Sequence, residues 1–230
     1  MTDNSPIKKY LSHPKVVLLD YINPTVSVTA TRTCWGSLDK MDSKDDELGP
    51  KDRELLDRVG NKYRHGSVLE HLVFSFHVKD VSRALLQEHS RHRMASISVR
   101  SSRYTIKELR DEKAFITVDK FDFERASKYV VFTGNETVDT FILENLENLR
   151  FTVVSGASND IVKYTLPEAY KTEFVWTVNA RSLQNYLKLR THKSALWEIR
   201  NLAYAVFEAI PEDLKYLFEE YVYKGEHNGK

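Results

Sequence analysis

Apolar residues recur at every second position in two stretches of this chain. They are HLVFSFHVKD, residues 71–80, and KTEFVWTV, residues 171–178. Alternation over this length is typical of a strand with one buried face. A shorter apolar run, VVLLDY from Val16, also predicts a strand.

Other stretches repeat apolar residues every three or four positions, which predicts helices. They are residues 53–64, 123–154 with a break near Gly134, 180–190, and 194–223, which has amphipathic helical spacing throughout.

Two further helices are predicted from their start signals. Asn23 is predicted to be the N-cap, and Pro24 the first residue, of a helix that continues through TVSVTATRTCW. Asp80 is expected to cap a helix that ends near RHR, residues 91–93, where cations suit the helix dipole. The polar stretch 39–52, with Gly-Pro near its end, predicts a surface loop.

The predicted strands and helices are mixed without regular βαβ alternation, so the expected class is α+β. We expect a single domain over residues 1–230, with an antiparallel or mixed sheet packed against helices. A chain of 230 residues is long enough to bury a sizeable core.

Composition narrows the function classes. The chain has 34 basic and 33 acidic residues, and this balance argues against general nucleic-acid binding. No apolar run approaches the roughly 18 residues of a membrane span, and the first 15 residues lack a signal-peptide core. With one cysteine, Cys34, a disulfide framework is impossible, so we expect a cytoplasmic protein. Cys34 itself is predicted to be structural.

The stretch RHRMASISVRSSRY, residues 91–104, concentrates four arginines and four serines in a nearly neutral chain. No glycine-rich phosphate loop of the Rossmann or P-loop type is present, so side chains would have to hold a phosphate. Arginine forks and serine hydroxyls do this well. A solvated basic turn is the alternative interpretation.

A second polar cluster, HGSVLEH, spans residues 65–71. His65, Glu70 and His71 have the chemistry of metal ligands. Their spacing matches no HExxH pattern, and the two histidines do not share a helical face. We therefore predict a histidine pair without a metal, and keep a metal-dependent hydrolase as an alternative.

The third cluster, NARSLQN at 179–185, follows a predicted strand directly. Asn179 stands where a helix N-cap belongs. Arg181 and Asn185 share one helical face, whereas Arg190 lies on the apolar stripe. A buried arginine needs an anion, and the nearby sequence offers no obvious one. A ligand anion is the expected partner of Arg190.

Together the three clusters resemble the flavin-dependent thymidylate synthases. Residues 91–93 and Ser101 fit that family's RHR-x7-S signature, and the stretches 65–71 and 178–190 resemble its other sequence blocks in the same order. The resemblance covers roughly residues 16–225. It implies the fold of thymidylate synthase complementing proteins and a homotetramer with active sites shared between subunits.

The implied reaction is the reductive methylation of dUMP to dTMP. FAD is the cofactor, and NADPH and 5,10-methylenetetrahydrofolate are the co-substrates. Arg190 is implied as the catalytic residue, and no metal is implied. By position, the FAD contacts are Ser67, Arg91, His92, Arg93, Val99, Asn179, Ala180, Arg181 and Asn185. By position, the dUMP contacts are Glu88, His89, Ser90, Arg91, Val99, Arg100, Ser101, Ser102, Arg103, Lys163 and Arg190.

The chain departs from the family pattern at three positions. Glu88 stands where Gln is common, Val99 where Glu or Gln is common, and Lys163 where Arg is usual. Lysine loses the bidentate fork. A carboxylate relocated from near 99 to Glu88 is expected to orient Arg91. A nucleotide-binding regulatory protein without catalysis is the alternative function.

Overall fold

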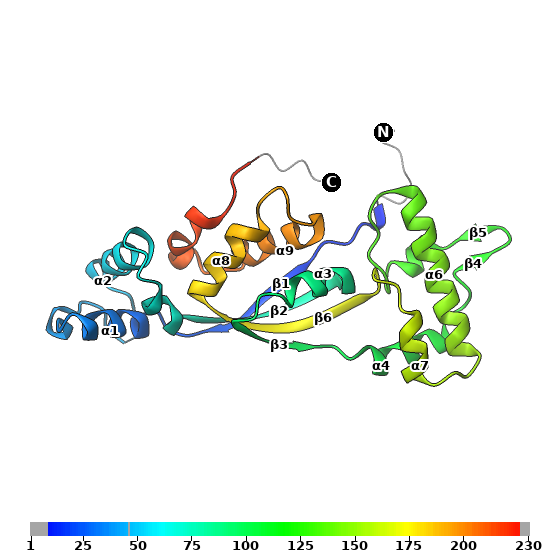
Figure 1. The fold of residues 1–230 in the computed structure, drawn as a ribbon, viewed down its shortest axis with the longest axis horizontal. Helices are drawn as coiled ribbons and strands as arrows, with labels where there is room; N and C mark the ends of the chain where they lie inside the picture. The colour runs from blue at the N-terminus through cyan, green and yellow to red at the C-terminus, as the bar shows by residue number, and fades with distance from the viewer. Residues whose placement is uncertain (1–8, 46, 226–230) are drawn as a thin grey trace.

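The computed structural model describes residues 9–45 and 47–225 (Figure 1). Residues 1–8, on which the expected lack of an export signal partly rests, lie outside the described residues. At the centre is a four-stranded antiparallel sheet with the strand order β1-β2-β6-β3. A short hairpin, β4 with β5, is separate from it. The strands are β1 (Lys15–Tyr21), β2 (Val73–Ser82), β3 (Ala95–Val99), β4 (Ile116–Thr117), β5 (Lys120–Phe121) and β6 (Lys171–Asn179).

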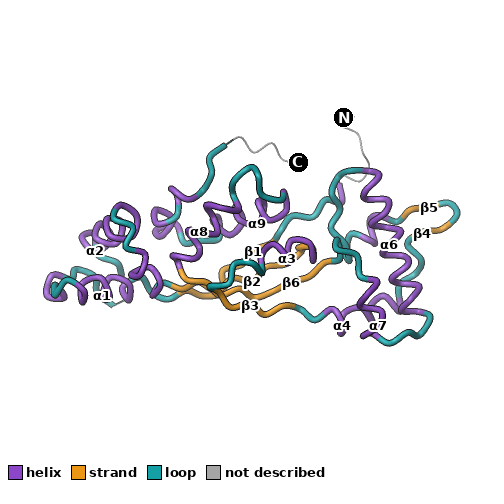
Figure 2. The backbone as a smooth tube through the Cα atoms, viewed as in Figure 1, coloured by secondary structure: helices purple, strands orange, loops and turns teal. Residues whose placement is uncertain are grey.

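Helices α3, α8 and α9 lie over one face of the central sheet, and α1 with α2 and α6 with α7 lie beyond its two ends (Figures 1 and 2). Along the described residues, no helix is both long enough and apolar enough to cross a membrane. The α-helices are α1 (Thr25–Cys34), α2 (Pro50–Asp57), α3 (Arg83–His89), α4 (Ser102–Thr105), α5 (Phe123–Ala126), α6 (Glu136–Val154), α7 (Asn159–Val162), α8 (Ala180–Arg190) and α9 (Trp197–Glu208).

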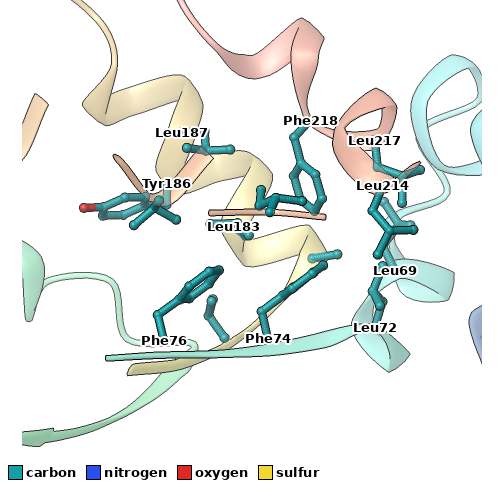
Figure 3. Close-up of a cluster of buried hydrophobic side chains, with 14 of the residues drawn as sticks. Leu69, Leu72, Phe74, Phe76, Leu183, Tyr186, Leu187, Leu214, Leu217 and Phe218 are labelled. Carbon is teal, nitrogen blue, oxygen red and sulfur yellow. The ribbon is translucent and has the colours of Figure 1, made fainter. Parts of the chain in front are cut away.

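The larger core lies between the sheet and helices α8 and α9. Alternation in β2 turns Phe74 and Phe76 to the same face, and both are fully buried. The helical repeat of α8 places Leu183 and Leu187 opposite them, as Figure 3 shows, and Phe218 closes the cluster. Buried aromatic and aliphatic side chains of this size each contribute about 1.5–3 kcal/mol to stability.

A second core forms within the segment between β3 and β6, where α6 packs against the rest of that segment. It includes Leu143 and Leu146 of α6, together with Phe115 and Phe132. The amide of Lys171, the first residue of β6, donates to the Tyr129 carbonyl at 2.7 Å, so the sheet is bonded directly to this second core. The single domain over residues 1–230 stays a prediction.

The strands predicted by alternation are confirmed, but the expected cap at Asp80 is wrong. Asp80 lies within β2 at a bulge, with φ of 59°, and its carboxylate pairs with Lys15 and Lys171. Ser82 caps α3 instead, accepting a hydrogen bond from the Leu85 amide at 3.0 Å. The bulge inserts one extra residue, and β2 continues to Ser82, so the helix starts after the aspartate.

The C-terminal prediction is only partly correct. A helix does begin at Trp197, but it ends at Glu208, and Pro211 precedes two short 3₁₀ turns, Glu212–Leu217 and Glu219–Tyr221. Proline cannot donate the backbone hydrogen bond that would continue the helix.

The polar stretch 39–52 is not simply a surface loop. Asp52 lies inside α2, is fully buried, and forms an ion pair with the buried Arg32. Its carboxylate also accepts from Ser43 and from the Asp42 amide. Burial raises the pKa of Asp52, but these hydrogen bonds outweigh it and hold the pKa below its usual value.

Two other expectations from the sequence need correction. Cys34 is exposed at the end of α1, so it has no core-packing role. Residues 95–99 form an edge strand, β3, that the basic composition of 91–104 concealed. Ile97 pairs with Trp176 across the ladder, and Arg93 and Arg100 flank the strand.

Candidate active site

A cavity of about 610 Å³ opens at one end of β3, between α8 and the loop that follows α3. Its volume falls within the roughly 300–1,000 Å³ of typical small-molecule sites. The lining residues are Glu88, Arg91, His92, Arg93, Met94, Ala95, Trp176, Val178, Arg181, Ser182, Asn185, Leu189, Arg190, Ser194 and Ala195.

Sheet pairing brings the first and third polar clusters together. The 91–93 loop leads into β3, which pairs with β6, and α8 follows β6 without a linker. Asn179 caps α8, accepting from the Ser182 amide at 2.8 Å, as its position predicted. Arg93 and Arg181, 88 positions apart in the sequence, therefore face the same cavity.

The guanidinium of Arg190 is held by three hydrogen bonds. Its Nη1 donates to Glu88 Oε2 at 2.8 Å and its Nη2 to the Glu88 carbonyl at 3.0 Å. Its Nε donates to His92 Nε2 at 2.9 Å. The chain itself thus supplies the anion that the sequence did not reveal, so the expectation that only a ligand would balance Arg190 is wrong. The expected pairing of Glu88 with Arg91 is also corrected, since Glu88 bonds to Arg190.

Two histidines, His92 in the cavity lining and the buried His89 behind it, have lowered pKa values. Burial, followed by the charges of His92 and Arg190, lowers the pKa of His89 to about 3. Burial and the charge of Arg190 lower the pKa of His92 to about 4, although Glu88 opposes the shift. His92 Nε2 therefore accepts from Arg190, which places its proton on Nδ1. The His89 ring packs at a tilt against Phe174 and edge to face against Trp176 and Tyr186.

The second polar cluster contacts the cavity through Arg181. A Cβ on Gly66 would lie 2.9 Å from the Arg181 side chain, so glycine leaves room for the arginine to cross this segment. Arg181 Nη1 donates to Glu70 Oε1 at 2.6 Å. Among residues 9–45 and 47–225, no three potential metal ligands lie together. Ser67 lies on the same 3₁₀ segment, Gly66–His71, outside the cavity lining.

The predicted phosphate-binding residues beyond β3 lie at the other end of that strand. There, Ser101 is the N-cap residue of α4, and Ser102 and Arg103 lie in it. Lys163 begins the short turn that follows α7 (Figure 1). Arg103 pairs with Asp160 at 3.0 Å, and Arg100 pairs with Glu108 at 2.8 Å. At roughly 3.3 Å per residue, β3 separates this group from the cavity by more than 10 Å.

Several predicted contacts lie near the cavity without lining it. His89 is buried, and Ala180 is buried with its amide bonded to the Leu72 carbonyl. Ser90 ends α3, and Val99 is exposed on β3. The contacts assigned to these residues remain predictions.

Sequence reasoning missed the apolar part of the wall. Trp176, Val178 and Leu189 line the cavity beside the arginines. Alternation in β6 did predict that Trp176 and Val178 share one face, but it gave no reason to place a cavity there.

The family model for "Thymidylate synthase complementing protein" matches residues 17–213. The chain belongs to this family. Members of the family include the flavin-dependent thymidylate synthase of Wolinella succinogenes, which is 54% identical over 203 residues, covering 88% of this chain and 96% of that protein. The Campylobacter jejuni enzyme of the same name is 53% identical over 210 residues, covering 91% and 98%.

A solved structure of this family has the same fold. The Helicobacter pylori thymidylate synthase X, crystallised with FAD and dUMP, superposes with a TM-score of 0.84 at 44% identity. The alignment covers 91% of this chain and 99% of that one. The α+β fold expected from the sequence is confirmed.

Proposed function

We propose that this chain is a flavin-dependent thymidylate synthase, which converts dUMP to dTMP with 5,10-methylenetetrahydrofolate and NADPH. The observation that carries the proposal is the cavity at the end of β3. It gathers Arg91, Arg93, Arg181 and Arg190 from two distant segments, with Glu88 as the acidic side chain among its lining residues. An excess of arginine over acid in one hollow favours an anionic ligand.

The cavity lining suits FAD in particular. Arg91, Arg93 and Arg181 offer charged forks for a pyrophosphate, and Trp176 and Leu189 offer an apolar surface for a flat aromatic ring. These residues would hold the cofactor. When bound, FAD supplies the hydride, which explains why the protein needs no nucleophilic cysteine.

Arg190 is the residue we assign to the uracil. Three of its five N–H groups are used within the chain, so two remain for a ligand. A uracil that gathers negative charge during reaction is stabilised by a fixed cation beside it. The side chain is 16% exposed and already held, so it needs no reorganisation when the substrate binds.

We further propose a homotetramer with sites shared between subunits. Within one chain, Arg190 lies at the cavity end of β3 and Arg103 beyond the other end. The sequence predicts that both arginines contact dUMP. A second copy of the chain is the simplest source of the dUMP contacts that one chain does not bring together. A cytoplasmic location belongs to the same proposal and is supported by the exposed free thiol of Cys34, which suits a reducing compartment.

The central experiment is an assay of dTMP formation from dUMP with methylenetetrahydrofolate and NADPH, on protein whose absorption spectrum shows bound flavin. Turnover supports the proposal. Flavin-loaded protein without turnover contradicts it and favours a nucleotide-binding regulator.

Shared sites are tested by mixing Arg190→Ala and Arg103→Ala proteins after dissociation and reassociation, at dUMP well below saturation. If the two arginines of one site come from different chains, the mixture exceeds the sum of its parts. Activity equal to that sum contradicts sharing, and light scattering gives the oligomeric state directly.

A further inference from the structure

Glu88 contacts Arg190 in two ways. The Glu88 carboxylate accepts a hydrogen bond from Arg190 Nη1 at 2.8 Å, and the Glu88 backbone carbonyl accepts one from Nη2 at 3.0 Å. A third donor, Nε, is fixed by His92. Two bonds to one residue, from two different nitrogens, define the plane of the guanidinium as well as its position.

The surroundings make this clamp necessary. Arg190 ends α8 on its apolar side, with Tyr186 one turn earlier and fully buried. An arginine without an anionic partner in such a place moves toward water. The side chain of Glu88 is 39% exposed at the edge of the cavity, where it holds Arg190 against that tendency.

His92 completes the clamp only as an acceptor. Its ring stacks edge to face on Tyr186, with the centroids 4.8 Å apart, and this contact limits its rotation. The Glu88–Arg190–His92 cluster thus joins the end of α3, the loop before β3 and the end of α8 at one guanidinium.

We propose that Glu88 is a positioning residue of the reaction, which acts on the substrate through Arg190 and not by contacting dUMP. The inference rests on the proposed function. It replaces the expected role of Glu88 as a dUMP contact. The carboxylate fixes the one cation assigned to the uracil.

A double-mutant cycle separates acting through Arg190 from acting directly. In the wild-type background, Glu88→Ala lowers kcat about 10- to 100-fold, the worth of a charge-assisted hydrogen bond. The KM for dUMP changes little, because no dUMP contact is lost. In the Arg190→Ala background, Glu88→Ala lowers kcat no further. An equal loss in both backgrounds, or a raised KM as the main effect of Glu88→Ala, overturns the proposal.

Two variants complete the series. Glu88→Gln keeps a side-chain acceptor for Nη1 and recovers most of kcat, which a general loss of structure would not allow. Glu212→Ala removes another surface carboxylate, paired with Lys215 at 2.9 Å far from the cavity, and leaves kcat unchanged. Flavin content and melting temperature are measured for every variant.

A second measurement needs no turnover. In ligand-free protein labelled with ¹⁵N-arginine, the Arg190 Nη1–H that donates to the Glu88 carboxylate gives a protected signal, assigned by its absence in Arg190→Lys. The signal is lost in Glu88→Ala and kept in Glu88→Gln. A signal unchanged in Glu88→Ala overturns the inference. If the wild type makes no dTMP, the proposed function fails, and this spectrum still decides whether Glu88 holds Arg190.

Discussion

The two ends of β3 carry the same kinds of side chain in different states. At the cavity end, Arg190 is 16% exposed and bonded to Glu88 and His92. At the far end, the side chains of Arg100 and Arg103 are 44% and 54% exposed, and each pairs with a surface carboxylate. Exposed pairs are worth about 0–1 kcal/mol, so the far arginines exchange partners readily.

This difference assigns different tasks to chemically identical groups. A cation fixed before the ligand arrives costs no reorganisation during reaction, which is what stabilising a transition state requires. A cationic side chain that is exposed and weakly paired suits the binding of a phosphate, for which affinity matters more than exact placement. Removing an arginine from each end should therefore change different kinetic constants.

The largest effect is expected at the cavity end. Arg190→Ala should lower kcat about 10²–10³-fold, because a preorganised donor facing developing charge is lost. Steady-state dTMP formation at saturating dUMP measures this. Arg190→Lys keeps the charge without the fork and should fall between wild type and alanine. Near wild-type kcat in a folded, flavin-loaded Arg190→Ala protein would remove Arg190 from the mechanism.

At the far end the effect should appear in KM. Arg103→Ala should raise the KM for dUMP about tenfold, with kcat nearly unchanged, because a phosphate contact is lost. Arg110→Ala, an exposed arginine on the neighbouring 3₁₀ segment Ile106–Asp111, is the matched control and should leave both constants unchanged. A fall in kcat equal to that of Arg190→Ala would erase the distinction between the ends.

The pH dependence of stability sharpens the comparison through His89, which is buried at the cavity end. Its pKa falls from 6.5 when unfolded to about 3 when folded, mainly by burial. Between these values the unfolded state binds the extra proton, so stability is lost as pH falls below 6.5. The slope contributed is about 1.4 kcal/mol per pH unit.

Replacing the His89 imidazole tests whether this residue causes the pH dependence of stability. His89→Phe should reduce the dependence of unfolding free energy on pH between about 6.5 and 4, measured by denaturant titration, and the lowered pKa of His92 accounts for part of the slope that remains. His71→Gln, at an exposed histidine, should leave the slope as in the wild type. An unaltered slope in His89→Phe would show that His89 is protonated in the folded protein.

The smallest effect is expected from Cys34→Ser. The thiol is exposed at the end of α1, away from both ends of β3, and the proposed chemistry uses no thiolate. Turnover and melting temperature should match the wild type. Loss of turnover in folded, flavin-loaded Cys34→Ser protein would contradict hydride delivery by flavin.

Local signals predicted much of the fold. Alternation predicted β2 and β6, because one face of each strand packs on the core. The Asn179 cap and the spacing of Leu183 and Leu187 predicted α8, because both depend on neighbours within one helix. β3 was missed because its edge position leaves Ile97 and Val99 partly exposed among serines and arginines, so its apolar signal is weak.

For the site, the sequence by itself determined which residue types are available and, through the spacing of the three clusters, the family to which they belong. Tertiary structure alone decided their partners. Glu88 and Arg190 are 102 positions apart, and they meet because β3 pairs with β6 and the end of α8 contacts the end of α3, where Tyr186 also touches His89. Long-range ion pairs depend on that packing, and no local spacing rule encodes it. The same packing left Arg103 at the far end of β3, where one chain alone does not complete the proposed site.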